Sequence, residues 1–146
     1  MRKALLSIAM LALSLLTFAP TTMARESAAP TLTVKSSSFG RVLFDGRGFV
    51  LYAFTRDKNG RSACYGACAK AWPVYYAKGT LRAGSGIKRS LIGTTKRRDG
   101  RRQVTYAGRP LYYYVSDTKT GQIGCQNVVE FGGTWLIVRS SGKLVR

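Results

Sequence analysis

The sequence predicts a mostly β fold in which two tandem β-rich repeats pack as one small domain, with one short helix after the motif of the first repeat. Runs of β-prone residues alternate with turns that contain Gly or Asp along most of the chain. The stretch "LYAFTRD" at residues 51–57 returns as "LYYYVSD" at residues 111–117, sixty positions later. Each copy is followed by a loop with cysteine and then by a tryptophan, Trp72 or Trp135. A pattern that recurs at one offset is typical of a repeated structural unit.

Residues 1–24 have the features of a secretory signal peptide. Arg2 and Lys3 form a positive start, residues 4–19 are an apolar core, and "TMA" at residues 22–24 offers small residues for cleavage. The apolar core is shorter than the ~20 residues that a spanning helix needs. We therefore expect an exported protein, periplasmic or secreted, without a transmembrane segment after cleavage. Residues 25–30 then form a flexible lead-in, and residues 31–146 form a single domain.

The first repeat is expected at about 31–78. "TLTVKS" at residues 31–36 alternates apolar and polar side chains, as a half-buried strand does. "RVLFDGRGFVLYAF" at residues 41–54 predicts a hairpin that turns at Asp45-Gly46. "CYGACAKAW" at residues 64–72 is Ala-rich and ends just before a proline, so it predicts the helix.

The second repeat is expected at about 91–138. "LIGTTKRRDGRRQVTYAGRPLYYYV" at residues 91–115 predicts a hairpin with a type I′ turn at Asp99-Gly100. "GTWLIV" at residues 133–138 predicts a last strand. The intervening "KGTLRAGSGIKRS" reads as a linker between the repeats. The two repeats should pack together, because one small sheet cannot bury its apolar face alone.

The motif tyrosines predict a shared core. Alternate side chains of a strand share a face, so Tyr52 should lie with Phe54, and Tyr112 with Tyr114. A buried tyrosine hydroxyl needs a partner, which Asp57 or Asp117 can supply while also fixing a turn. The alternative is an aromatic surface that lines a ligand groove.

Both stretches fit the pattern Tyr-x-(Phe/Trp/Tyr)-x-x-Asp, and this pattern resembles that of a bacterial family of predicted lipoproteins, also described as a secreted repeat of unknown function. "CYGACAKAWP" is similar to the family's Cys-x-Gly-x-Cys-Ala-x-x-Trp-Pro segment, and "CQNVVEFGGTW" to its Gly-Gln-Gly-Val…Gly-Gly-x-Trp ending. The chain differs from the family in two ways. It has no cysteine near the cleavage point for lipid attachment, and Cys125 stands where a glycine is usual.

Three cysteines allow three single-bridge pairings, and export permits a disulfide. The resemblance implies a bridge between Cys64 and Cys68. Pairing of Cys125 with either of them stays open on the sequence alone. These three cysteines also support the alternative function, a small periplasmic redox or copper-handling protein.

The charge of the chain favours anionic partners. Its 24 Lys and Arg outnumber its 6 Asp and Glu, for a net charge of +18. We therefore consider lipopolysaccharide, acidic lipids and acidic cell-wall polymers as partners. Nucleic acid is disfavoured by export and by the absence of a known binding motif. The densest cluster is "KRRDGRR", whose anion-binding candidates are Lys96, Arg97, Arg98, Arg101 and Arg102; its alternative role is an ordinary solvated loop.

The sequence favours a protein that is not an enzyme. It has no histidine, so it cannot form a Ser-His or Cys-His couple. Of its carboxylates, Glu26 falls in the lead-in, Glu130 in an expected loop, and the four aspartates (Asp45, Asp57, Asp99 and Asp117) at expected turns. No carboxylate pair for acid–base catalysis is evident, and we expect neither a cofactor nor a metal. The prediction is an exported, non-enzymatic binding or structural module that binds an anionic envelope component.

Overall fold

The computed structural model describes residues 31–146, so the expected signal peptide at 1–24 and lead-in at 25–30 lie outside the described residues. The described chain is mostly β with one short helix, which confirms the predicted fold class. The elements are β1 (Leu32–Ser37), β2 (Gly40–Asp45), β3 (Tyr52–Phe54), α1 (Ala67–Ala71), the 3-10 helix η1 (Arg89–Leu91), β4 (Ile92–Lys96), β5 (Arg102–Tyr106), β6 (Arg109–Pro110), β7 (Val128–Glu130) and β8 (Gly133–Ile137). Across this part of the chain, no helix has the length and apolar character that crossing a membrane requires.

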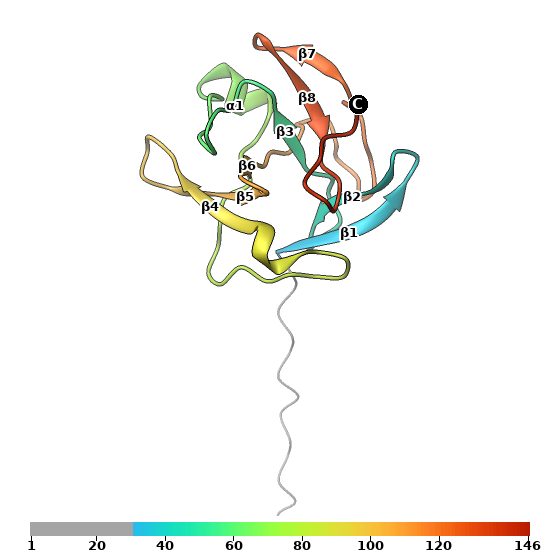
Figure 1. Cartoon of the computed structure of the whole chain (residues 1–146). Helices are drawn as coiled ribbons and strands as arrows, with labels where there is room; N and C mark the ends of the chain where they lie inside the picture. The colour runs from blue at the N-terminus through green and yellow to red at the C-terminus, as the bar shows by residue number, and fades with distance from the viewer. Residues whose placement is uncertain (1–30) are drawn as a thin grey trace, which may run out of the picture.

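The strands form three small antiparallel sheets around a common centre (Figure 1). β1 pairs with β2, β4–β5–β6 form a second sheet, and β3–β8–β7 form the third. The third sheet joins the halves of the chain, because Tyr52 of β3 lies opposite Ile137 of β8 and Phe54 lies opposite Trp135. The two repeats are therefore packed as one small domain.

Two apolar clusters fill the interior, on opposite faces of the motif segments. Tyr52 and Tyr112 belong to the first cluster, together with Phe54. Leu51 and Leu111, which precede the two tyrosines, belong to the second cluster. This division follows from the alternation of side chains along extended backbone.

The predicted hairpin at 41–54 forms only in part. The turn is present, since the Gly48 amide donates to the Asp45 carbonyl at 3.0 Å and the Asp45 amide donates to the Phe49 carbonyl at 2.8 Å. Only one bridge, Phe44 to Val50, continues from it. β2 instead takes β1 as its ladder partner, and β3 takes β8. The chain leaves the hairpin because the tyrosine of β3 meets the other repeat.

The prediction of a type I′ turn at Asp99-Gly100 is wrong. That turn requires positive φ at both central residues, and only Gly100 has it, at +81°. The Gly100 amide donates to the Arg97 carbonyl at 3.0 Å, and the Arg97 amide to the Arg101 carbonyl at 2.9 Å. The β4–β5 connection is thus a three-residue loop with a left-handed glycine.

Three smaller expectations need correction. The helix predicted at 64–72 is limited to α1, because Gly66 adopts a φ of +56° that a helix excludes. Glu130 is the last residue of β7 rather than a loop residue. The expected linker packs along β1, where the Val34 amide donates to the Ser85 carbonyl at 2.9 Å. Its Leu81 and Ile87 pack against the second cluster.

Candidate functional site

The motif tyrosines meet at the centre of the molecule. The Tyr52 amide donates to the Tyr112 carbonyl, and the Tyr112 amide donates to the Tyr52 carbonyl, both at 2.9 Å. This reciprocal pair is an antiparallel bridge between the two repeats. Equivalent residues that exchange equivalent bonds indicate a local two-fold relation between the repeats.

The tyrosine–aspartate bonds cross between the repeats. The Tyr52 hydroxyl donates to Asp117 at 2.6 Å, and the Tyr112 hydroxyl donates to Asp57 at 2.8 Å. The second oxygen of each carboxylate holds its own repeat's loop. Asp57 accepts from the Ala63 amide at 2.8 Å, and Asp117 from the Gly124 amide at 2.8 Å. Each aspartate therefore ties one repeat's loop to the other repeat's core.

Burial sets the electrostatics of these pairs. Desolvation of the charged form raises the pKa of Asp57 to about 6, against the opposing hydrogen bonds from Ala63 and Tyr112. The pKa of Asp117 is also raised, for the same reason. Desolvation raises the pKa of Tyr52 and of Tyr112 as well. Both hydroxyls stay protonated at neutral pH and act as hydrogen-bond donors.

The motif aromatics form a packed column. Trp72 and Trp135 stack with ring centres 3.9 Å apart, and Phe54 stacks on Trp135 at 4.1 Å. Tyr52 meets Trp72 edge-on at 5.3 Å, and Tyr112 meets Trp135 edge-on at 5.1 Å. All five rings are buried. They fill the core and are not accessible to a ligand.

Tyr114 is the one motif aromatic that is not fully buried. It is half-buried and lies against Trp72 with ring centres 4.8 Å apart. Trp72 also donates its indole N–H to Glu130 at 2.8 Å, whereas the equivalent N–H of Trp135 is buried without a partner. The two-fold relation of the repeats thus extends to the rings but not to the surroundings of their polar atoms.

The cysteines form one bridge. Cys64 and Cys68 are joined by a disulfide, and Cys125 is a free, buried thiol. Desolvation raises the pKa of the Cys125 thiol, which disfavours the reactive thiolate. In residues 31–146, no group of three or more His, Cys, Asp or Glu side chains is arranged to hold a metal ion.

The basic hairpin divides into buried and exposed cations. Arg97, expected among the anion-binding residues, is buried. Its guanidinium donates to the Cys64 carbonyl at 2.6 Å, and to Ser62 Oγ and Gln103 Oε1 at 2.7 Å each. The Ser62 hydroxyl in turn donates to the Tyr112 hydroxyl oxygen, 2.7 Å away, because the single Tyr112 proton is directed to Asp57. Arg97 therefore fixes the hairpin to the motif and does not face solvent. Its two terminal nitrogens join a polar network in the interior, whereas its Nε is buried without a partner.

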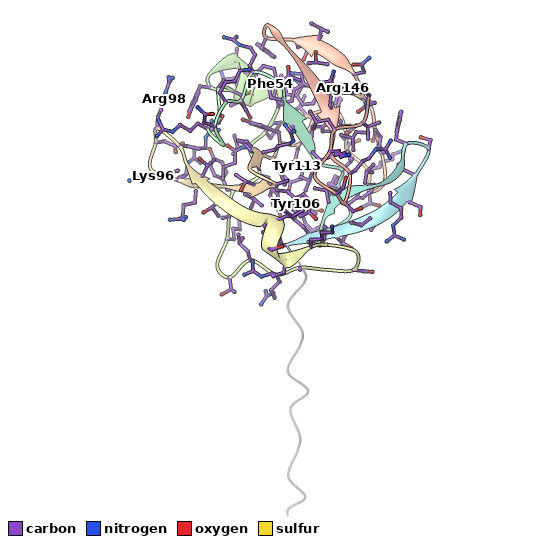
Figure 2. All side chains as sticks on the ribbon, viewed as in Figure 1. Phe54, Lys96, Arg98, Tyr106, Tyr113 and Arg146 are labelled. Carbon is purple, nitrogen blue, oxygen red and sulfur yellow. A yellow bond between two sulfur atoms is a disulfide. The ribbon has the colours of Figure 1, made fainter. Side chains whose placement is uncertain are left out.

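The other four candidates are exposed. Figure 2 shows Lys96 and Arg98 at the outer end of the β4–β5 hairpin. Arg98 lies over the Tyr65 ring at 4.5 Å, and Arg101 lies over the Tyr76 ring at 4.0 Å. Arg101 is also paired with Asp99 at 2.6 Å. Arg102 donates through two nitrogens to Thr94 Oγ1.

Arg98 joins cations of the first repeat around a hollow of about 580 Å³. We call it the cationic hollow; its lining residues are Arg56, Lys58, Asn59, Arg61, Ser62, Ala63 and Arg98. Lys58 and Arg61 flank a tight turn in which Asn59 and Gly60 both have positive φ. Arg56 is fixed by donation to the Phe131 carbonyl at 2.9 Å. No carboxylate lines this hollow.

Three of these cations are not among the anion-binding candidates predicted from the sequence. Arg56, Lys58 and Arg61 surround Asp57 in "TRDKNGR". The sequence prediction for this segment concerned only the motif aspartate and the turn that follows it. The usable signal was the charge density of this segment, which holds three cations in seven residues. Its proximity to Arg98 depends on tertiary structure, because the two segments lie in different repeats.

A protein-family model described as a secreted repeat of unknown function matches the chain twice, at residues 33–75 and 93–139. The two matches together cover more than half of the chain. One contains Tyr52 and Asp57, and the other contains Tyr112 and Asp117. No curated protein and no solved structure matches the chain.

Proposed function

The chain belongs to the family of secreted repeats of unknown function, and on that premise we propose that it is an exported, non-enzymatic module that binds an anionic component of the cell envelope. The component is lipopolysaccharide, an acidic lipid or an acidic cell-wall polymer. The binding surface is the cationic hollow, extended by the exposed cations of the β4–β5 hairpin.

The observation that carries this proposal is how the carboxylates are used. Each of the five in the described range accepts a hydrogen bond within the fold; they are Asp45, Asp57, Asp99, Asp117 and Glu130. Within residues 31–146 only Arg47 and Arg101 form ion pairs. The cations of the hollow are therefore not neutralised by the protein itself.

Crowded like charges repel one another, and a bound polyanion relieves that repulsion. Arginine suits this role, because its planar guanidinium grips a phosphate or carboxylate with two parallel hydrogen bonds. Arg61 and Arg98 come from different repeats, so one anionic group held between them would bridge the two halves. Such contacts are exposed, so the affinity should fall as salt is added.

A non-enzymatic role is supported by the same carboxylates. Asp57 and Asp117 each use both oxygens to hold a loop and a tyrosine. Asp45 is buried and accepts from its own turn. None of these groups is left to move a proton in a substrate. The chain also has no histidine.

The redox or copper-handling alternative has weaker support. Two of the three sulfurs, those of Cys64 and Cys68, are held in a disulfide. The third, Cys125, is buried with a raised pKa. Copper(I) binding needs accessible thiolates, which this arrangement does not offer.

The test compares two variants of equal charge. Arg61→Glu with Arg98→Glu reverses two cations in the hollow, and Lys119→Glu with Lys143→Glu reverses two exposed lysines elsewhere. We expect the hollow variant to weaken binding to anionic vesicles or lipopolysaccharide by about tenfold or more at low salt, because it removes charge-assisted hydrogen bonds. The control should change little beyond the effect of net charge.

Binding is measured by vesicle co-sedimentation over a salt series. Equal losses in the two variants would show that only net charge matters and would refute a site at the hollow. No binding of the wild type to any anionic surface at low salt would refute the proposed function itself.

A further inference from the structure

A second cavity, of about 420 Å³, lies apart from the cationic hollow and shares no lining residue with it. We call it the tyrosine cavity. Three tyrosines line it, Tyr75, Tyr76 and Tyr113, and three cations, Arg47, Lys78 and Arg82. Its volume is within the range of about 300–1,000 Å³ that small-molecule sites occupy.

The floor of the tyrosine cavity is rigidly held. Asp45 is buried and accepts from the Tyr113 hydroxyl at 2.9 Å and from Arg47 Nε at 2.9 Å. Tyr75 donates its hydroxyl to the Thr31 carbonyl at 2.5 Å, and its ring meets that of Tyr113 at 5.3 Å. Figure 2 labels Tyr113 near the middle of the molecule's outline, and its side chain is half-buried. A floor with its rotamers fixed in this way is pre-organised for a ligand.

The rim supplies positive charge that is free to bind. Lys78 and Arg82 are exposed, and neither forms an ion pair with a residue of the described chain. The side chain of Arg47 is 69% exposed, although Asp45 and Tyr113 hold one edge of its guanidinium. A negative group at the mouth of this cavity would therefore meet Lys78 and Arg82, which are unpaired, beside Arg47, which is already paired with Asp45.

The chemistry of the lining discriminates between ligands. Val74 is the one aliphatic side chain larger than a methyl group on it, so the apolar part of the lining comes mainly from tyrosine rings rather than from aliphatic side chains. Aromatic rings and hydroxyls dominate instead, including those of Thr31 and Thr80. Tyrosine rings pack against the C–H faces of a sugar, and hydroxyls exchange hydrogen bonds with its hydroxyl groups.

We propose that the tyrosine cavity binds a sugar ring that bears a negative group, either a carboxylate or a phosphate. The ring lies against Tyr76 at the entrance, and its acidic group faces Lys78 and Arg82. This inference rests on the proposed function, since the sugar would be one unit of the anionic envelope component. It adds a recognition site to the non-selective charge of the cationic hollow.

The Arg101–Tyr76 contact connects this cavity to the basic hairpin. Arg101 covers the Tyr76 ring at 4.0 Å, and Tyr76 also forms a β-bridge with Gln103 of β5. A long acidic polymer can thus have one sugar in the tyrosine cavity while its neighbours follow the cations of the hairpin. Repeated weak contacts along one chain raise the overall affinity.

The experiment titrates four soluble probes by calorimetry: trigalacturonate for the carboxylate, glucose 6-phosphate for the phosphate, fully methyl-esterified trigalacturonate as the neutral control, and inorganic polyphosphate. Lys78→Gln with Arg82→Gln alters the tyrosine cavity. Lys58→Gln with Arg61→Gln makes the same charge change at the cationic hollow. Inorganic polyphosphate, which has no sugar, reports on the hollow.

We expect the cavity variant to weaken binding of the acidic sugar by about tenfold or more, because two charge-assisted contacts are lost. The hollow variant should leave that binding within about twofold, since it shares no lining residue with the cavity. For polyphosphate the hollow variant should show the larger loss. Tyr76→Leu keeps every charge and should also weaken binding of the acidic sugar.

Three results would overturn this inference: equal binding of the neutral ester, wild-type sugar binding by the cavity variant, or no effect of Tyr76→Leu. If the acidic sugars do not bind but polyphosphate binds and is weakened by the hollow variant, the inference alone is wrong. If no anionic probe binds at low salt, the proposed function fails with it. The side chains of Lys78 and Arg82 make no hydrogen bond within the described chain, so their loss should not unfold the protein.

Discussion

Each motif aspartate holds its own repeat's loop with one oxygen and the other repeat's tyrosine with the second. The crossed bond from Tyr52 to Asp117 is short and buried, and the bond from Tyr112 to Asp57 is partly buried. A buried donor that loses its partner carries the full cost of its desolvation. These pairs therefore connect the two repeats more firmly than their number suggests.

A double-mutant cycle should measure this connection. Asp117→Asn should lower the free energy of unfolding by about 1–3 kcal/mol, because the Tyr52 hydroxyl loses a charged acceptor in the interior. Tyr52→Phe should cost less, and the double variant should cost less than the sum. Chemical denaturation gives the four values. If Asp117→Asn leaves stability unchanged but abolishes ligand binding, the structural role assigned to the motif is incorrect.

Asp57 gives the protein a pH-dependent stability. Its pKa rises from 3.8 in the unfolded chain to about 6 in the fold, so the folded state holds more protons between these values. Stability from this group is full below pH 4 and falls as pH rises through 6, by up to about 3 kcal/mol. Asp57→Asn should flatten the profile between pH 4 and 7.

The measurement is the denaturant midpoint at several pH values, with Asp117 left intact in both proteins. The pKa of Asp117 is also raised, so the variant should keep part of the slope. A stability of the wild type that rises steadily from pH 4 to 7 would contradict the assigned direction.

Among the elements, the turns decide how strands pair. The type I′ geometry expected at Asp99-Gly100 occurs at other two-residue turns, one of which is Ala107-Gly108, where φ is +49° and +73°. This turn connects β5 to β6 and leads directly into the second motif. Ala107 carries a side chain in a conformation that L residues disfavour by about 1–2 kcal/mol.

Ala107→Gly should therefore raise the free energy of unfolding by up to about 1 kcal/mol, since it removes that backbone cost. Gly108→Ala should lower it by about 1 kcal/mol. An added methyl group at Gly108 meets nothing within 4 Å, so this loss isolates the conformational effect. Thermal unfolding of the two variants and the wild type measures both changes. Destabilisation by Ala107→Gly would show that the alanine side chain makes a packing contact that outweighs its strain.

Most strands could be predicted at this scale, but their partners could not. Alternation located β1, and β-prone runs located β3 and β8. The ladder between β3 and β8 joins segments about eighty residues apart, so no local pattern encodes it. The short β7 was not predicted, and the helix predicted at 64–72 was too long; a left-handed residue, Phe131 or Gly66, sets the end of each element.

For the whole molecule, shared packing and excess charge are the two dominant features. One small sheet cannot bury its apolar face, and here three sheets with few strands each do so together. The chain has 6 carboxylates against 24 cations, and the five in residues 31–146 accept hydrogen bonds within the fold, which leaves a strongly positive surface. The proposed binding of anions follows from this distribution rather than from any single residue.

Only part of the candidate site could be predicted from the sequence. Arg98 was identified from the charge density of its hairpin, and it lines the cationic hollow. Arg97, its neighbour, has the same charge and the same local context but is buried in a polar network. Sequence spacing cannot separate them, because the direction of each side chain depends on which residues of the other repeat lie behind the hairpin.

The sequence by itself determined the repeat, the β-rich class and the excess of positive charge, since these are properties of composition and local period. Only the tertiary structure decided that Tyr52 pairs with Asp117 and Tyr112 with Asp57. The motif residues occur in both copies, so their order along the chain is equally compatible with bonds within a repeat. The crossing arises because the two tyrosines meet backbone to backbone at the centre, which points each hydroxyl toward the other repeat's loop.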